Sequence, residues 1–154
     1  MTETCTLVIF GATGNLAQIK LLPSLYHLDA AELLPTSLRI VCSGRTEHTQ
    51  ESWREHVKES LAQHARDSQA AAHCDRFCDR MHYLQGDIAK QSTFKALADL
   101  LAGSSYPDNH VFYVSLPPST YGGIVESLDD QGMLEENGAW RRVVIEKPFG
   151  SSLE

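Results

Sequence analysis

The chain lacks the features that place a protein in a membrane, outside the cell or on a nucleic acid. None of the apolar stretches in its 154 residues approaches the length of a membrane span, and the first residues show no charged segment followed by an apolar one, as in a signal peptide. No basic run is longer than Arg141-Arg142, and the formal net charge is −7. We therefore expect a cytoplasmic protein with no membrane and no nucleic-acid partner.

Cysteine is scarce as well, at Cys5, Cys42, Cys74 and Cys78 only. Cys74 and Cys78 would share one face of a continuous helix with His82, which raises a zinc site as an alternative. Structural zinc sites usually take paired ligands from two separated segments, and the sequence has no second pair. We therefore expect reduced thiols and no metal site.

Apolar strand-like runs alternate with helix-like segments, and the chain has no internal repeat and no low-complexity stretch. Strands are expected over residues 4–10, 38–43, 81–85, 110–115 and 142–145. Helices are expected over residues 15–28, 50–65, 66–80, 93–101 and 120–128. This alternation predicts one α/β domain over residues 1–154, a Rossmann-type doubly wound, mostly parallel sheet with helices on both faces.

Three details of the helices are also expected. The apolar spacing of the first helix predicts one common side made by Leu16, Ile19, Leu22 and Tyr26. Pro23 lies inside that pattern and should bend or tighten the helix, because it cannot donate a backbone hydrogen bond. Ser92 precedes the 93–101 helix and is expected to cap it.

A glycine-rich turn directly follows the first strand. Gly11 would permit a tight turn, Gly14 would let the backbone approach a phosphate, and Ala17 would let the next helix pack close to the sheet. The unpaired N–H groups of the helix's first turn would face a pyrophosphate. A tight strand–helix connection without a ligand is the alternative, so the turn indicates a dinucleotide site but does not establish it.

The residues after the second strand suggest which dinucleotide binds. An acid at that strand tip would accept hydrogen bonds from a ribose 2′-hydroxyl and favour NAD, whereas an arginine suits a 2′-phosphate. Here the strand is followed by Arg45, and the nearest acid is Glu47. Thr13 can add a hydroxyl from the first turn. The pattern favours NADP over NAD, with a solvated loop arginine as the alternative.

Two further segments lie where the fourth and fifth strands end, at the edge where open α/β sheets bind ligands. Lys147 stands between Glu146 and Pro148, so its backbone is extended and its side chain has a set direction. It would donate to a sugar hydroxyl or a nicotinamide carboxamide. Tyr121 follows two prolines and could line the same cleft. The alternatives are a surface ion pair and an aromatic ring packed on its own helix.

Four separated motifs resemble the glucose-6-phosphate dehydrogenase family. They are Gly11-Ala12-Thr13-Gly14-Asn15-Leu16-Ala17 with Lys20 and Pro23 behind it, Gly44-Arg45, Leu116-Pro117-Pro118-Ser119-Thr120-Tyr121, and Glu146-Lys147-Pro148-Phe149-Gly150. They occur in family order, so the resemblance covers the whole chain. The sequence departs from the family at Asn15, where an Asp is usual, and at Gln18-Ile19, where the family is richer in lysine.

The resemblance implies an NADP site and a part of the site for glucose 6-phosphate. The pyrophosphate would lie along Gly11, Ala12, Thr13, Gly14, Asn15 and Leu16. Arg45 would hold the 2′-phosphate, and Tyr121 would line the cofactor cleft. Lys147 would contact both the nicotinamide end and the sugar, and Lys20 would help to bind the substrate.

The chain lacks the motif that carries the family's catalytic base. That base is a histidine in an Arg-Ile-Asp-His-Tyr-Leu-Gly-Lys-Glu type segment, and no histidine here has such a context. The resemblance therefore implies the coenzyme domain of a longer, homo-oligomeric dehydrogenase whose α+β substrate domain is missing, with no catalytic residue in this chain. A stand-alone NADP-binding regulatory module is the main alternative. A short-chain reductase is a third, but the Tyr-x-x-x-Lys pair that it needs is absent.

Overall fold

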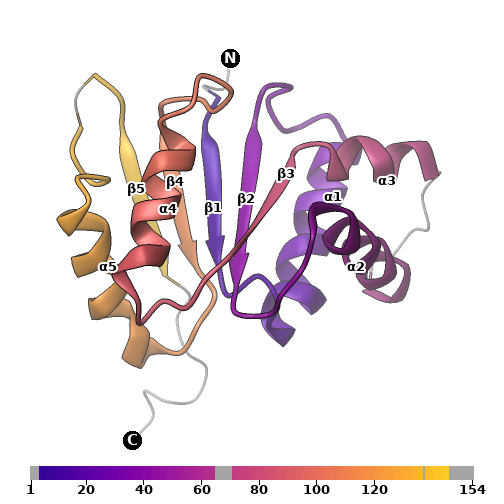
Figure 1. Ribbon diagram of the computed structural model, residues 1–154. Coiled ribbons are helices and arrows are strands. Elements are labelled where there is room, and N and C mark those ends of the chain that lie inside the picture. The colour runs from indigo at the N-terminus through magenta and orange to yellow at the C-terminus, as the bar shows by residue number, and fades with distance from the viewer. Residues whose placement is uncertain (1–3, 65–70, 137, 146–154) are drawn as a thin grey trace, which may run out of the picture.

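The computed structural model describes residues 4–64, 71–136 and 138–145, and these residues form a five-stranded sheet with helices on both faces (Figure 1). The strands β1 (Thr6–Phe10), β2 (Arg39–Gly44), β3 (Met81–Gln85), β4 (His110–Val114) and β5 (Arg141–Ile145) lie in the order β3-β2-β1-β4-β5. All four strand pairings are parallel. The predicted α/β fold is confirmed, and the order reverses direction at β1, where doubly wound sheets bind their ligands.

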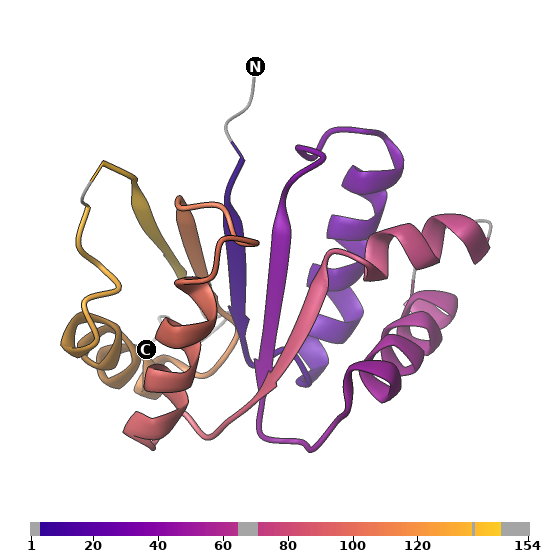
Figure 2. The same cartoon turned by 45° about the horizontal axis from the view of Figure 1, so that its top comes forward.

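The helices fall into two groups, one on each face of the sheet (Figures 1 and 2). One group contains α1 (Leu22–Ala30), α2 (Gln50–His64) and α3 (Ala71–Cys78), and the other contains α4 (Gln91–Leu101) and α5 (Tyr121–Asp130). Side chains of β1 alternate between the two cores: Leu7 and Ile9 pack with the first group, and Val8 and Phe10 with the second. A strand buried on both faces reads as a continuous apolar run, which is why β1 was recognisable in the sequence.

The first helix differs from its expected pattern. Helical backbone begins at Asn15, but Ala17–Leu21 forms a π-helical turn (η1), closed by a hydrogen bond from the Leu22 N–H to the Ala17 carbonyl. Pro23 follows in the first turn of α1, so the helix is widened before the proline and not tightened by it. The wide turn changes which residues face the sheet.

The predicted apolar side of this helix is therefore partly wrong. Leu22 and Tyr26 are buried as expected, but Leu16 and Ile19 are 37% and 50% exposed. Ala17 and the polar Gln18 take the buried positions instead. A regular period of 3.6 residues cannot anticipate this arrangement, because a π turn adds a residue to one turn and shifts the register.

The observed N-cap of α4 differs from the predicted one. Helix α4 begins at Gln91 with Lys90 as its N-cap, so the predicted cap at Ser92 is wrong. The Asp87 side chain accepts a hydrogen bond from the Ala89 N–H at 2.9 Å, in the turn before the helix.

Helix α3 ends at Cys78, before His82 of β3, so the three candidate zinc ligands do not share one helix. Among the described residues, no helix is both long and apolar enough to cross a bilayer.

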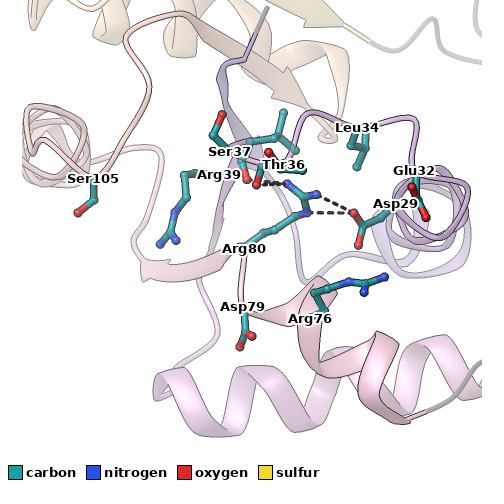
Figure 3. Close-up of a pocket in the computed structure, with 11 residues that line it drawn as sticks. Asp29, Glu32, Leu34, Thr36, Ser37, Arg39, Arg76, Asp79, Arg80 and Ser105 are labelled. Atoms are coloured by element: carbon teal, nitrogen blue, oxygen red, sulfur yellow. Dashed lines mark hydrogen bonds and ion pairs between the residues drawn. The ribbon is translucent and has the colours of Figure 1, made fainter. Parts of the chain in front are cut away.

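A hollow of about 760 Å³ lies at the amino ends of β2 and β3 (Figure 3). Arg80 reaches into it and donates through Nε and Nη2 to Asp29 Oδ1, at 3.1 and 2.7 Å. Its Nη1 also donates to the carbonyls of Pro35 and Leu38, at 2.8 and 3.0 Å. Arg80 thus ties the end of α1 and the connection to β2 onto β3, and its charge is satisfied within the fold.

We expect Arg80→Ala to lower the free energy of unfolding by about 3 kcal/mol, because it leaves a buried carboxylate without its main cation. The Asp29 and Arg80 side chains are only 5% and 12% exposed. Arg54→Ala is the matched control, because Arg54 pairs with Asp79 at 2.9 Å and with Asp75 at 3.6 Å near the surface, where each such pair contributes at most about 1 kcal/mol. Chemical denaturation measures both losses, and losses of equal size would contradict the prediction.

Candidate coenzyme site

The glycine turn (residues 11–14) is held between the carboxyl ends of β2 and β4. Gly11 has a φ of +85°, a conformation that favours glycine. Its N–H and that of Ala12 both donate to the Ser43 carbonyl at 3.0 Å. A Cβ on Gly11 would lie 2.4 Å from the Ser115 carbonyl oxygen. The predicted tight turn at Gly11 is confirmed, and the close approach of β4 leaves no room there for a side chain.

Gly14 differs from Gly11, because it borders open space. A Cβ built on it would meet only the Gly11 carbonyl oxygen, at 3.4 Å. The Gln18 N–H donates to the Gly14 carbonyl at 3.1 Å, which is the first bond of the helix. The N–H groups of residues 15–17 precede that bond and have no acceptor within the helix. The turn therefore presents backbone donors and the positive end of the helix dipole to exposed space, as an anion site requires.

Gln18 holds this turn in shape, and sequence reasoning missed it. Its side-chain Nε2 donates to the Ala12 carbonyl at 2.7 Å, and its backbone carbonyl accepts from Ser60 Oγ at 3.1 Å. Both Gln18 and Ser60 are buried. The signal that could have found it is a polar residue four positions after Gly14, directly after the small Ala17. Ala17 itself is fully buried, as its expected role in close packing requires.

The tip of β2 lies next to the glycine turn. A Cβ on Gly44 would lie 2.8 Å from Thr13 Oγ1, so only glycine lets the two segments approach this closely. Arg45 follows and is exposed. Its carbonyl accepts from Gln85 Nε2 at 3.3 Å, and the carbonyl of Thr46 accepts from the Tyr83 hydroxyl at 2.5 Å. The backbone that carries Arg45 is therefore fastened to β3, while the residue itself remains exposed.

An aromatic cluster of Trp53, Tyr83, His48 and His56 packs around the ring whose hydroxyl holds this backbone. The rings of Trp53 and Tyr83 lie 4.8 Å apart, and the His48 ring meets Tyr83 edge-on at 5.2 Å. Burial raises the pKa of Tyr83 to about 12, so its hydroxyl keeps its proton and donates to Thr46 at neutral pH. Burial and the neighbouring His48 lower the pKa of His56, which favours a neutral ring there. The base of the loop is thus tightly packed, and the conditions at Tyr83 and His56 favour their neutral forms.

A second hollow, of about 370 Å³, opens beside Arg45. It lies between the carboxyl ends of β2 and β3 and the first turns of α4. Charged and polar residues line it, among them Arg45, Gln85, Asp87, Lys90 and Ser92. In sheets of this topology the adenosine half of a dinucleotide extends from the first turn toward the end of the second strand. The hollow is therefore at the position that an adenosine moiety would occupy.

The structure describes the predicted site residues Thr13, Lys20 and Tyr121 but not Lys147. Thr13 is half-buried in the turn, Lys20 is exposed on η1, and Tyr121 is half-buried at the start of α5. The segment that carries Lys147, residues 146–150, lies outside the described residues. The structure thus brings the turn and Arg45 to one edge of the sheet, with Tyr121 after the neighbouring strand β4.

The parallel sheet, its order of strands and the open glycine turn at the point of reversal define a Rossmann-type dinucleotide-binding domain. The chain belongs to the glucose-6-phosphate dehydrogenase family: a sequence model described as "Glucose-6-phosphate dehydrogenase, NAD binding domain" matches residues 8–154.

Individual relatives agree with this assignment. The chain is 40% identical over 153 residues to a glucose-6-phosphate 1-dehydrogenase of Treponema pallidum, covering 96% of this chain and 30% of that protein. It is 34% identical over 157 residues to one of Aggregatibacter actinomycetemcomitans, covering 99% of this chain and 31% of that protein. The chain therefore spans about a third of the length of these relatives.

Solved structures show the same similarity. A crystal structure of glucose-6-phosphate 1-dehydrogenase from Mycobacterium avium superposes with a TM-score of 0.82 at 30% identity, covering 96% of this chain and 31% of that one. A glucose-6-phosphate dehydrogenase in complex with its substrate glucose-6-phosphate superposes with a TM-score of 0.80 at 26% identity, covering 97% and 32%. The sheet and its carboxyl edge are thus shared with proteins of this family.

Proposed function

We propose that this chain is the coenzyme-binding domain of an NADP-dependent glucose-6-phosphate 1-dehydrogenase, which oxidises glucose 6-phosphate to 6-phosphogluconolactone in the pentose phosphate pathway. The observation that carries the proposal is the glycine turn, where residues 15–17 offer backbone donors beside the open space at Gly14. The matched relatives are named as dehydrogenases, which favours this function over a stand-alone NADP-binding regulatory module.

NADP is the proposed coenzyme because of the residue at the tip of β2. Arg45 offers a planar fork of donors that fits a phosphate dianion, and its backbone is fastened by Gln85 and Tyr83. Among the described residues, the Arg45 side chain has no hydrogen-bond or ion-pair partner. An acid that would accept bonds from a free 2′-hydroxyl does not occupy this tip.

In the proposed reaction, a base takes the proton from the anomeric hydroxyl while hydride leaves the same carbon. A bound coenzyme would supply the hydride acceptor at its nicotinamide end. The described residues bind and orient: the glycine turn holds the pyrophosphate, Arg45 the 2′-phosphate, and Tyr121 lines the cleft. Lys147 and Lys20 are proposed to contact the sugar phosphate. The base is proposed to lie in the substrate domain, outside this chain.

We expect Arg45→Gln to lower kcat/KM for NADP by roughly tenfold to a hundredfold in the full enzyme, the scale of a charge-assisted contact of about 1.5–3 kcal/mol. The value with NAD should change little, because NAD has no 2′-phosphate. NADPH and NADH formation from glucose 6-phosphate, followed by absorbance, measures both. Arg76→Gln is the matched control, an exposed arginine lining the hollow at the opposite edge of the sheet.

Two outcomes of this assay would contradict the proposal. A full enzyme without activity on glucose 6-phosphate would reject the reaction. An Arg45→Gln variant that keeps the preference for NADP would show that Arg45 is not the selecting residue. The 154-residue chain alone is expected to give no turnover with either coenzyme, because it lacks the proposed base.

A further inference from the structure

We propose that Lys90 is a second cation for the coenzyme's 2′-phosphate, acting with Arg45 across the 370 Å³ hollow. The inference rests on the proposed use of NADP. It adds a residue that the four family-like motifs do not contain and that comes from a different strand–helix unit. Arg45 follows β2, whereas Lys90 stands at the start of α4, after β3.

The two cations line one hollow without partners in the described part of the chain. Among the described residues, neither the Arg45 guanidinium nor the Lys90 ammonium makes a hydrogen bond or an ion pair. Two other lysines are paired: Lys58 of α2 with Asp75 at 2.6 Å and Lys95 of α4 with Asp99 at 3.7 Å. Two unpaired like charges at one hollow repel each other, and a bound anion removes that cost.

One acid and one hydroxyl line the hollow together with the two cations. Asp87 is the acid that lines this hollow, and its Oδ1 already accepts from the Ala89 N–H. Ser92 also lines it, and because Lys90 is the N-cap of α4 the Ser92 hydroxyl caps nothing. The two cations outnumber the one carboxylate, so the hollow has a net positive charge. The Ser92 hydroxyl and the two cationic groups also remain available as hydrogen-bond donors.

The charge of a 2′-phosphate also favours two cations over one. A phosphate monoester carries about −1.5 to −2 at neutral pH, which one arginine balances only in part. A compact ammonium complements the planar guanidinium, because it contacts a phosphate oxygen as a point charge without a fixed plane. Arg45 after β2 and Lys90 at the start of α4, which line the same hollow, therefore match a dianion better together than either does alone.

The test is a titration of this chain with two probes that differ only in the group at issue, adenosine 2′,5′-bisphosphate and adenosine 5′-monophosphate. We expect Lys90→Gln to weaken binding of the bisphosphate about tenfold, the scale of one charge-assisted contact. Binding of the monophosphate should change less than about twofold, and Lys90→Arg should keep most of the affinity. Calorimetry gives the constants, and circular dichroism confirms that each variant is folded.

Lys95→Gln is the matched control, because it removes the same charge from an exposed position of the same helix. It should leave both affinities unchanged. Equal weakening by Lys90→Gln and Lys95→Gln, or no weakening by Lys90→Gln, would overturn the proposal for Lys90. Wild-type chain that binds both probes equally would instead reject the NADP selection on which it rests. If only the Arg45→Gln variant lost the preference for the bisphosphate, the proposed selection of NADP would stand and only the role of Lys90 would be rejected.

Discussion

Gly14→Val is expected to weaken NADPH binding by roughly a hundredfold or more, about 2.7 kcal/mol or above, while the chain stays folded. The side chain would project into the open space beside the turn, where a Cβ meets only the Gly11 carbonyl oxygen at 3.4 Å. Two methyl groups there would keep the pyrophosphate from the N–H groups of residues 15–17. The measurement is fluorescence titration with NADPH, together with the melting temperature of the variant.

The matched control is Gly103→Val, at the other end of the domain. A Cβ on Gly103 would meet the Leu100 carbonyl oxygen at 3.3 Å, almost the same surroundings as at Gly14. Each variant should lose no more than about 1 kcal/mol of stability, as is usual for exposed positions. Only the Gly14 variant should lose the coenzyme. A folded Gly14→Val chain with normal affinity would remove the phosphate-binding role of the turn.

The same substitution three residues earlier should instead destabilise the fold itself. Gly11→Val is expected to lower the free energy of unfolding by about 5 kcal/mol, enough to unfold many domains of this size. Two costs add together there. The φ of +85° is unfavourable for a β-branched residue, and the Cβ would lie 2.4 Å from the Ser115 carbonyl oxygen. Backbone at this distance cannot move aside without separating β1 from β4.

Gly138→Val separates those two costs, because Gly138 has a φ of +83° but no atom within 4 Å of an added Cβ. It should lose only the conformational part, about 1–2 kcal/mol. Chemical denaturation of both variants, with soluble yield as a second readout, measures the difference. A Gly11 variant no less stable than the Gly138 variant would show that the approach of β4 to the turn is looser than the structure indicates.

Much of this fold could be predicted because its signals are local. Residues 7–10 of β1 form an unbroken apolar run that ends at a glycine, and residues 111–114 of β4 form another that ends shortly before two prolines. Such runs between helix-like segments permit few topologies, since parallel strands need crossover connections on the faces of the sheet. The glycine spacing of residues 11–17 then placed the turn correctly, down to the left-handed Gly11.

The errors and omissions share a different cause. Leu16 and Ile19 were expected on a common side with Leu22, but the π turn shifts the helix register and exposes them. The role of Gln18 was missed because its partners, the Ala12 carbonyl and Ser60, come from the turn and from α2. A residue pattern within one segment contains no information about the partners that another segment supplies.

The sequence by itself determined the order and type of the elements, the tight turn at Gly11 and the arginine after β2, because each depends on neighbours along the chain. Only the tertiary structure decided that the turn is held by Ser43, that Tyr83 fastens the backbone at Thr46, and that Lys90 lines a hollow with Arg45. Those contacts join residues from different strand–helix units. They exist only once the parallel sheet has brought the carboxyl ends of its strands to one edge, because that arrangement alone places the connecting loops side by side.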